Sequence, residues 1–453
     1  MRVIALLPEA IILATAAVLP LGRRLVPERR ELNWLAPLAV LAALLLELWL
    51  GAPVGSLFSG GWLQDRFSLF GKAALLLGLL VFVVVDREPE AWPDLEAFAF
   101  LAVFGGMVAV SAPTLVGLWA GLELAALAGV AASGFSSRTA ASELLLVSAT
   151  AGGLLALGFA FLYALAGTTS LAGLRLGLAH RQLALPLALI VLLVLSGLAL
   201  RLALAALAGN GGRKADTRGQ AVPAALLSAV ALLVAAKLLP SLAAATIVWA
   251  PWLAVLSAAA MLLGGLRAAA LSRPERQAVW LALGQVGWVG AALASPQQRG
   301  TAAALFLLGC LLFAWVGAAL LARLEPSALA GLSSRDPLRA AGLGLALLSL
   351  AGAPPLGGFF GEFAVAAELI RSNLGWVLAA GLLGWIAGLY GVIRTLARSY
   401  LEAAPEPPRR GPRPASVWTV SALLPAVLVL GYGLFAFPIH SLASQGAAAL
   451  GLR

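Results

Sequence analysis

Long apolar segments recur from one end of this chain to the other, with only short polar connections between them. Apolar residues make up 62% of the 453 residues and charged residues only 11%, whereas soluble domains are about 45–50% apolar and about 25% charged. A helix that crosses a bilayer needs about 20 apolar residues. The sequence therefore predicts a membrane protein with many spans and no large domain outside the membrane.

Fourteen segments have the length and composition of transmembrane helices. We predict an all-α polytopic membrane protein with about fourteen transmembrane helices, at residues 3–21, 34–51, 69–85, 97–111, 114–133, 141–166, 183–208, 222–239, 247–270, 277–293, 301–321, 339–366, 374–397 and 417–437.

Residue types that hold metals and redox groups are scarce. The only cysteine is Cys310, and the only histidines are His180 and His440. This argues against a disulfide framework, a cysteine cluster for zinc or iron and sulfur, and a histidine-ligated haem. We expect no cofactor, no metal and no redox centre in this chain.

The net charge of +10 comes from basic residues scattered singly through the connections. Because no basic stripe interleaves with aromatic residues, we expect no nucleic-acid partner. Connections after odd-numbered segments hold 18 Lys and Arg residues, while those after even-numbered segments hold 7 when the two termini are included. The positive-inside rule then predicts that the odd-numbered loops are cytoplasmic and that both termini lie outside.

Two ionisable residues lie deep inside apolar segments of the first half. Glu123 is in the middle of the fifth segment, and Arg201 follows a long apolar run in the seventh. A charge near the bilayer centre costs at least about 2.5–3.5 kcal/mol, so such residues persist mostly where they face a partner or a conduction path. We expect a functional pair of Glu123 and Arg201. A neutral Glu123 bonded to a backbone carbonyl is the alternative.

Two more charges lie nearer the ends of segments. Glu143, near the start of the sixth, could join the same cluster or lie at a solvated helix end. Lys237, near the end of the eighth and just before Pro240, could serve proton transfer or extend its ammonium group to the interface.

The twelfth segment is interrupted. From residue 347 it reads Leu-Leu-Ser-Leu-Ala-Gly-Ala-Pro-Pro-Leu-Gly-Gly-Phe-Phe-Gly-Glu-Phe. Pro354 and Pro355 remove two backbone donors, and the glycines let the chain bend, so the pattern predicts a broken transmembrane helix. Such breaks mark ion-binding sites in transporters, and Glu362 would place its carboxylate beside this one. A kink that only improves packing is the alternative.

Three uncharged or peripheral positions complete the candidates. Gln285 is the central polar residue of the tenth segment and could order water. For Glu9 and Glu47, in the first two segments, we favour partly wetted helix ends over a buried role.

The chain resembles the antiporter-like proton-channel family shared by respiratory NADH-quinone oxidoreductase and the multisubunit sodium/proton antiporters. The resemblance covers almost the full length. The most specific motif is Ser-Leu-Ala-Gly-Ala-Pro-Pro-Leu-Gly-Gly-Phe from residue 349. Supporting motifs are Leu-Pro-Glu-Ala-Ile-Ile-Leu from residue 7, Gly-Leu-Glu-Leu from residue 121 and Tyr-Ala-Leu-Ala-Gly-Thr-Thr-Ser-Leu from residue 163.

The resemblance implies two inverted five-helix repeats, with the seventh and twelfth helices broken. It divides the chain into an N-terminal three-helix segment at residues 1–96, a first repeat at 97–240, a second repeat at 241–400 and a final part at 401–453 with a Pro-rich loop and the fourteenth helix. The implied partners are other membrane subunits of the same complex and the lipid bilayer, in a bacterial cell (inner) membrane.

The resemblance also assigns a proton path. Glu123 matches the fifth-span glutamate, Arg201 stands in place of a seventh-span lysine and Lys237 approximates an eighth-span lysine. Glu362 takes a position that is lysine or glutamate in the family. As secondary positions, Gln285 stands where a tenth-span histidine is usual and Glu143 where a sixth-span lysine is usual.

The implied function is proton translocation as a non-redox subunit of an NADH:quinone oxidoreductase. Arginine keeps its proton at any accessible pH, so Arg201 is a poor proton carrier. Two alternatives therefore stay open: a subunit of a multisubunit sodium/proton antiporter, and a non-conducting structural subunit.

Overall fold

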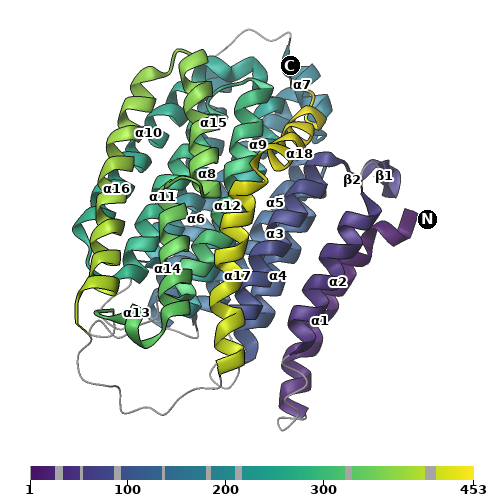
Figure 1. Ribbon diagram of the computed structural model, residues 1–453. Coiled ribbons are helices and arrows are strands. Elements are labelled where there is room, and N and C mark those ends of the chain that lie inside the picture. The colour runs from purple at the N-terminus through teal and green to yellow at the C-terminus, as the bar shows by residue number, and fades with distance from the viewer. Residues whose placement is uncertain are drawn as a thin grey trace.

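The structure is a computed structural model. It describes residues 2–25, 34–51, 55–85, 93–134, 138–179, 185–209, 217–321, 329–403 and 415–452. Long helices run side by side through most of this part of the chain (Figure 1). The predicted Pro-rich loop lies almost entirely outside the described residues.

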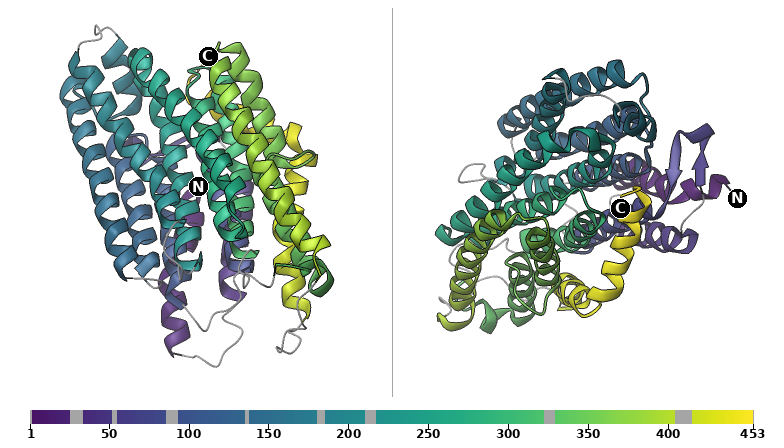
Figure 2. Two further views of the ribbon diagram at one scale, coloured as in Figure 1. Left: turned by 90° about the vertical axis from the view of Figure 1, so that its left-hand side faces the viewer. Right: turned by 90° about the horizontal axis from the view of Figure 1, so that it is seen from above.

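The N-terminal segment holds three long helices and a small hairpin. Its elements are η1 (Arg2–Leu6), α1 (Leu7–Leu25), α2 (Leu35–Leu50), β1 (Gly55–Leu57), η3 (Phe58–Gly60), β2 (Trp62–Gln64) and α3 (Arg66–Val85). The two strands pair antiparallel, with Gly55 opposite Gln64 and Leu57 opposite Trp62. Seen along the helices, this segment lies at one edge of the bundle (Figure 2).

The remaining helices form the body of the bundle. They are α4 (Pro93–Ser111), α5 (Leu115–Gly134), α6 (Arg138–Ala166), α7 (Leu171–Ala179), α8 (Leu185–Gly209), α9 (Thr217–Leu238), η4 (Leu239–Ala245), α10 (Thr246–Ala270), α11 (Pro274–Leu293), α12 (Gln298–Leu321), α13 (Leu332–Arg335), α14 (Pro337–Leu350), α15 (Gly357–Arg371), α16 (Gly375–Leu401), α17 (Ala415–Leu434) and α18 (Ala436–Ala449).

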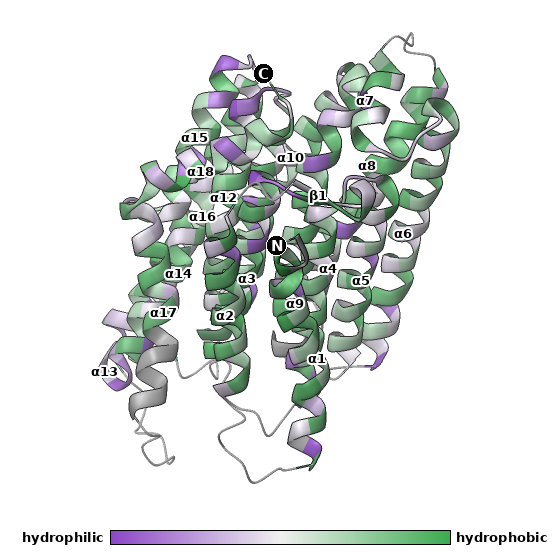
Figure 3. Ribbon diagram, turned by 90° about the vertical axis from the view of Figure 1, so that its right-hand side faces the viewer, coloured by the Kyte–Doolittle hydropathy of each residue, from purple (hydrophilic) through white to green (hydrophobic). Residues whose placement is uncertain are grey.

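Each of the fourteen predicted segments falls on one of these helices, and the twelfth falls on two. By length and composition, nine helical stretches of the described chain can cross a membrane, or ten if the bent pair α17 and α18 counts as one. A multispan helical membrane protein is thus confirmed, and the number fourteen stays a prediction. Most residues along the helices are apolar (Figure 3), as helices that cross a bilayer require.

The twelfth segment is broken as predicted, because α14 ends at Leu350 and α15 begins at Gly357. The implied break in the seventh helix is wrong. There α8 runs without interruption from Leu185 to Gly209. Its only proline, Pro186, lies in the first turn, where proline is tolerated, and residues 202–208 are all leucine or alanine, which favour helix.

Helix α12 occupies the centre of the bundle. Every residue from Gly300 to Leu321 is buried, and the helix contacts α3, α9, α14 and α15. A helix that is apolar on all sides lies either in lipid or among other helices, and the burial of α12 shows that other helices surround it. Helix α12 thus links α9 of the first predicted repeat to α14 and α15 of the second.

Candidate functional site

The predicted pair of Glu123 and Arg201 is present. Arg201, on α8, is fully buried although it is among the largest side chains of the chain. Its Nη2 donates to Glu123 Oε1 on α5, and its Nη1 donates to Ser148 Oγ on α6. The guanidinium group thus joins three helices through one carboxylate and one hydroxyl. Sequence reasoning did not identify Ser148.

A glycine makes room for this pair. A Cβ atom added to Gly152 of α6 would lie 2.3 Å from Glu123 Oε1 and 2.9 Å from Arg201 Nη2. Trp119 of α5 closes the same region by donating from Nε1 to the Gly152 carbonyl over 3.1 Å. Backbone therefore packs directly against the two charged groups.

Glu143 does not belong to this cluster, which corrects one of the two predictions for it. Its side chain is exposed, and among the described residues it forms no ion pair. Glu143 precedes Ser148 by five residues on α6. Five steps of about 100° place the two side chains roughly 140° apart around the helix, so only Ser148 faces Arg201.

Lys237 is inside the bundle and does not extend to the surface. It is 4% exposed. Its Nζ donates to the Val110 carbonyl of α4 and lies 5.6 Å from the ring centre of Phe67 on α3. Within the described part of the chain, no carboxylate lies within 4.0 Å of this ammonium group. Lys237 is therefore a buried basic group held by a backbone carbonyl and an aromatic ring.

The second predicted site lies at the break between α14 and α15. Glu362 is 6% exposed and Gln285 of α11 is 3% exposed. Gln285 Nε2 donates to Glu362 Oε1 over 2.5 Å and to the Leu350 carbonyl over 2.8 Å. The amide thus ties the carboxylate to a backbone oxygen that the helix break has freed.

Other protein groups satisfy the rest of the break. Trp385 Nε1 donates to the Gly352 carbonyl over 3.2 Å, and the backbone N–H of Gly358 donates to Ser349 Oγ over 3.3 Å. Gly352 has a φ of +67°, and a Cβ there would lie 1.8 Å from Glu362 Oε2. Only glycine fits between the carboxylate and Trp385 in this backbone conformation.

Glu9 and Glu47 are not wetted helix ends, which corrects that prediction. Glu9 is 4% exposed and Glu47 is fully buried. Lys72 Nζ of α3 lies 2.5 Å from Glu9 Oε1 and 3.8 Å from Glu47 Oε1. Lys72 of α3 and Gln64 of β2 reach the two carboxyl groups, so their burial follows from packing that sequence position does not reveal.

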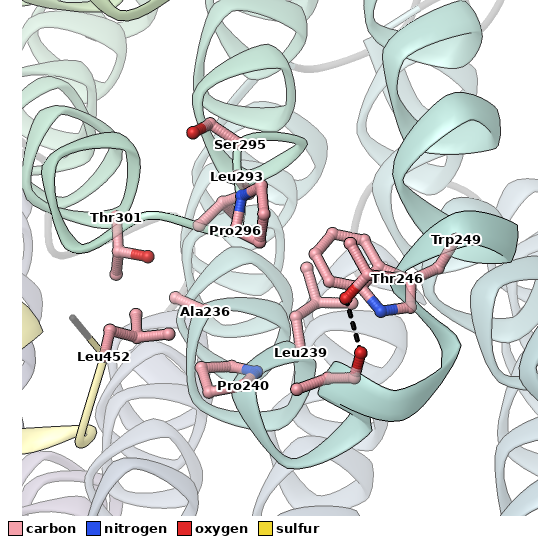
Figure 4. Close-up of a pocket in the computed structure, with 11 residues that line it drawn as sticks. Ala236, Leu239, Pro240, Thr246, Trp249, Leu293, Ser295, Pro296, Thr301 and Leu452 are labelled. Atoms are coloured by element: carbon pink, nitrogen blue, oxygen red, sulfur yellow. Dashed lines mark hydrogen bonds between the residues drawn. The ribbon is translucent and has the colours of Figure 1, made fainter. Parts of the chain in front are cut away.

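A pocket opens where α9 ends, α10 begins, α11 ends and α12 begins (Figure 4). The Thr246 hydroxyl on its wall donates to the Ala243 carbonyl over 2.7 Å. Its described lining residues include none that is ionisable: Ala236, Leu239, Pro240, Ala243, Thr246, Trp249, Leu293, Ser295, Pro296, Thr301 and Leu452. The pocket therefore carries no titrating group among its described lining residues, and Lys237 is not one of them.

The two acidic sites are separate in this conformation. Among the described residues, no hydrogen bond or ion pair joins Glu123, Lys237 and Glu362 to one another. The buried, largely apolar α12 packs against both α9 and α15. Transfer between the sites would need intervening water or a rearrangement of side chains.

Comparison with known proteins assigns the family. Residues 112–387 match the family described as "NADH:quinone oxidoreductase/Mrp antiporter, TM". NADH-quinone oxidoreductase subunit N of Cereibacter sphaeroides is 33% identical, over 94% of this chain and 96% of that protein. The subunit N of Granulibacter bethesdensis is 29% identical, over 98% of each.

Solved structures show the same fold. A chain of respiratory complex I from Thermus thermophilus superposes with a TM-score of 0.80 at 20% identity, covering 99% of this chain and 100% of that one. A chain of the Mrp complex from Dietzia sp. also gives 0.80, at 19% identity, with 99% and 98% covered. The chain belongs to the NADH:quinone oxidoreductase/Mrp antiporter family of membrane subunits.

Proposed function

We propose that the chain is a proton-translocating membrane subunit, similar to subunit N, of a quinone-reducing respiratory complex. The observation that carries the proposal is the presence of two acid sites inside apolar helices: Glu123 with the buried Arg201, and the buried Glu362 with Gln285. Carboxylates in such places persist mostly where they serve ion movement. The curated relatives named above are subunits N of NADH-quinone oxidoreductase.

In this proposal, electron transfer in partner subunits drives the protons, and this chain contributes no redox step. The partners are the other membrane subunits of the complex, in a bacterial inner membrane. The basic residues of the odd-numbered loops would place those loops in the cytoplasm. The two repeats would span residues 97–240 and 241–400, with one acid site in each.

The first step concerns the pair of Glu123 and Arg201. Arg201 stays charged throughout, so it holds Glu123 ionised while the two groups touch. Separation of the pair lets Glu123 take up a proton and changes the field at Lys237. An arginine suits this step, because the step needs a side chain that changes position while it keeps its proton.

The second step ends at the broken helix. A proton relayed from Lys237 through water would reach Glu362. There Gln285 orients the carboxylate and binds the neighbouring Leu350 carbonyl. The Gln285 Oε1 atom is buried and has no hydrogen-bond partner among the described residues, so it is available to accept from such a water. Glu362 would then release the proton on the far side.

Two alternatives remain. A sodium/proton antiporter subunit has the same fold, as the likeness to the Mrp complex of Dietzia shows, and it predicts sodium-dependent transport. A non-conducting structural subunit is favoured by Arg201 in place of a lysine and by Gln285 in place of a histidine. Replacing a single glutamate by glutamine, which cannot ionise, distinguishes the structural subunit from the proton-translocating subunit.

The test uses membrane vesicles that contain the whole complex. Glu123→Gln and Glu362→Gln each keep side-chain size and one oxygen acceptor but cannot ionise. We expect quinone reduction to continue while proton uptake into the vesicles falls. Glu275→Gln is the control, because Glu275 pairs with Arg273 at the start of α11, away from both sites.

Unchanged proton uptake in both variants would favour the structural subunit. Proton uptake that requires sodium ions would favour the antiporter. A loss in the control variant as well would show that the effect comes from disturbed assembly and not from proton transfer.

A further inference from the structure

A third group of buried polar side chains lies in the N-terminal segment, outside the part of the chain that matches the family at residues 112–387. It joins three helices and the hairpin. Lys72 Nζ contacts Glu9 Oε1 at 2.5 Å and donates to Gln64 Oε1 at 2.5 Å. Gln64 Nε2 in turn donates to Glu47 Oε1 at 2.6 Å. The result is a continuous chain from Glu9 through Lys72 and Gln64 to Glu47.

These groups are shut off from solvent and lipid. Lys72, Gln64 and Glu47 are fully buried, and Glu9 is 4% exposed. Trp62, next to the hairpin turn, lies with its ring centre 5.2 Å from Lys72 Nζ. The hairpin therefore covers the cluster at the ends of the helices.

The charges of the cluster do not balance. Two carboxyl groups meet one ammonium group, so a fully ionised cluster would hold one uncompensated negative charge in a site without water contact. An uncompensated buried charge is costly, and a buried carboxyl group takes up a proton instead. One proton shared by the two carboxyl groups makes the cluster neutral.

The cluster also has an open position for that proton. Glu47 Oε2 is buried and has no hydrogen-bond partner among the described residues. The other oxygen of Glu47 accepts from Gln64, so the free oxygen is where a carboxylic acid would carry its hydrogen. Both oxygens of Glu9 likewise lack a hydrogen bond of good geometry, although Oε1 lies against Lys72.

We propose that Glu9, Lys72, Gln64 and Glu47 form a proton-exchange site of the N-terminal segment, which binds and releases one proton in the working cycle. The inference rests on the proposed proton-translocating function. It adds a site that lies outside both repeats and that uses a carboxyl pair instead of a single acid.

The position of the cluster links it to Lys237. Lys237 lies over the ring of Phe67 in the first turn of α3, and it interacts electrostatically with Lys72 of the same helix. A proton gained or lost by the cluster changes the charge near Lys237 by one unit in a medium of low dielectric. The site can thus couple proton exchange under the hairpin to the charge state of Lys237.

Other charged groups of the elements packed here have partners of their own. Asp65 Oδ1 accepts from the backbone N–H of Ser68 over 2.7 Å, and Arg66 Nη1 donates to Gln445 Oε1 of α18 over 2.8 Å. Lys237 of α9 is bonded to Val110 of α4. The remaining titratable group on α18, His440, has its ring 5.7 Å from that of Phe306 on α12.

The test is infrared difference spectroscopy of the whole complex, turnover minus rest, in water and in deuterium oxide. A carboxylic acid that gains or loses its proton gives a carbonyl band that shifts in deuterium oxide. We expect Glu47→Gln to remove one such band, while Gln64 keeps its acceptor at residue 47. Glu9→Gln should remove the same band, because one acid and one base then remain and the cluster is neutral without a proton.

Glu368→Gln is the matched control. Glu368 is 2% exposed and accepts from Ser295 Oγ over 2.7 Å and from Ser372 Oγ over 3.1 Å. Its carboxyl group is as deeply buried but has no cation in contact among the described residues. We expect its replacement to leave the turnover bands of the cluster in place.

The outcomes separate this inference from the proposed function. If Glu123→Gln and Glu362→Gln stop proton uptake while Glu47→Gln and Glu9→Gln leave every exchangeable band intact, the N-terminal site is refuted and the function stands. If all four variants leave uptake and bands unchanged, the proposed function fails as well. Loss of the band in both cluster variants, with the control intact, supports the site.

Discussion

Gln285 and Glu362 meet across the break in the twelfth predicted span, where the amide donates to the carboxylate over 2.5 Å. The same nitrogen also donates to the Leu350 carbonyl, which the break leaves without a helical partner. One side chain therefore stabilises the interrupted backbone and orients the acid beside it. A change at Gln285 should therefore affect both the stability of the break and the orientation of Glu362.

Replacing Gln285 tests that double role. Gln285→Leu removes both hydrogen bonds and leaves the Leu350 carbonyl buried without a partner, a cost of about 1–3 kcal/mol. We expect a lower melting temperature of the solubilised complex together with reduced proton uptake. Gln285→His retains a donor and should keep both properties closer to the unchanged protein; equal behaviour of the two variants would contradict this role.

Two adjacent glycines of α6 offer a matched pair of variants. Alanine at residue 152 would place its Cβ 2.3 Å from Glu123 Oε1, whereas nothing lies within 4 Å of a Cβ at Gly153. We expect Gly152→Ala to separate Glu123 from Arg201 and to cost about 1–3 kcal/mol, as overpacking does. Gly153→Ala should be nearly silent. Thermal unfolding and proton uptake of both variants provide the measurement.

The stability of the complex should depend more on the positive charge at residue 201 than on the shape of the cation. Arg201→Met leaves Glu123 without its partner and Ser148 without its donor, so we expect destabilisation of about 3–5 kcal/mol. Arg201→Lys retains the charge but offers fewer donors in a less rigid geometry. We expect assembly of the complex, measured by gel filtration, to be impaired in Arg201→Met and preserved in Arg201→Lys. Full assembly of both would argue against the pair.

Charge inside an apolar run is the signal that sequence reasoning used well. This signal identifies Glu123, Arg201 and Glu362. Arg201 and Glu362 are buried, and Glu123, which is 17% exposed, pairs with Arg201. Ser148 could not be found by the same reasoning, because a serine in a membrane helix often bonds to its own backbone. Ser196 of α8 does so, donating to the Leu192 carbonyl over 2.7 Å.

The predictions for Glu9 and Glu47 are wrong because contacts between distant parts of the chain decide their burial. Glu9 and Glu47 lie near the ends of two different segments and Gln64 lies in a connection, so nothing local shows that the three meet around Lys72. The break in the seventh helix was carried over from the resemblance, although residues 202–208 of this chain contain no helix breaker. Burial of a helix end depends on which distant parts of the chain it meets, and local apolar patterns do not reveal those contacts.

The most direct test of proton translocation is the number of protons moved per electron by the complex with Glu362→Gln, measured at matched rates of quinone reduction. Glu362 is held by Gln285 at the helix break, and a glutamine there cannot carry a proton. We predict that the ratio falls while electron transfer continues. A ratio equal to that of the unchanged complex would contradict the account.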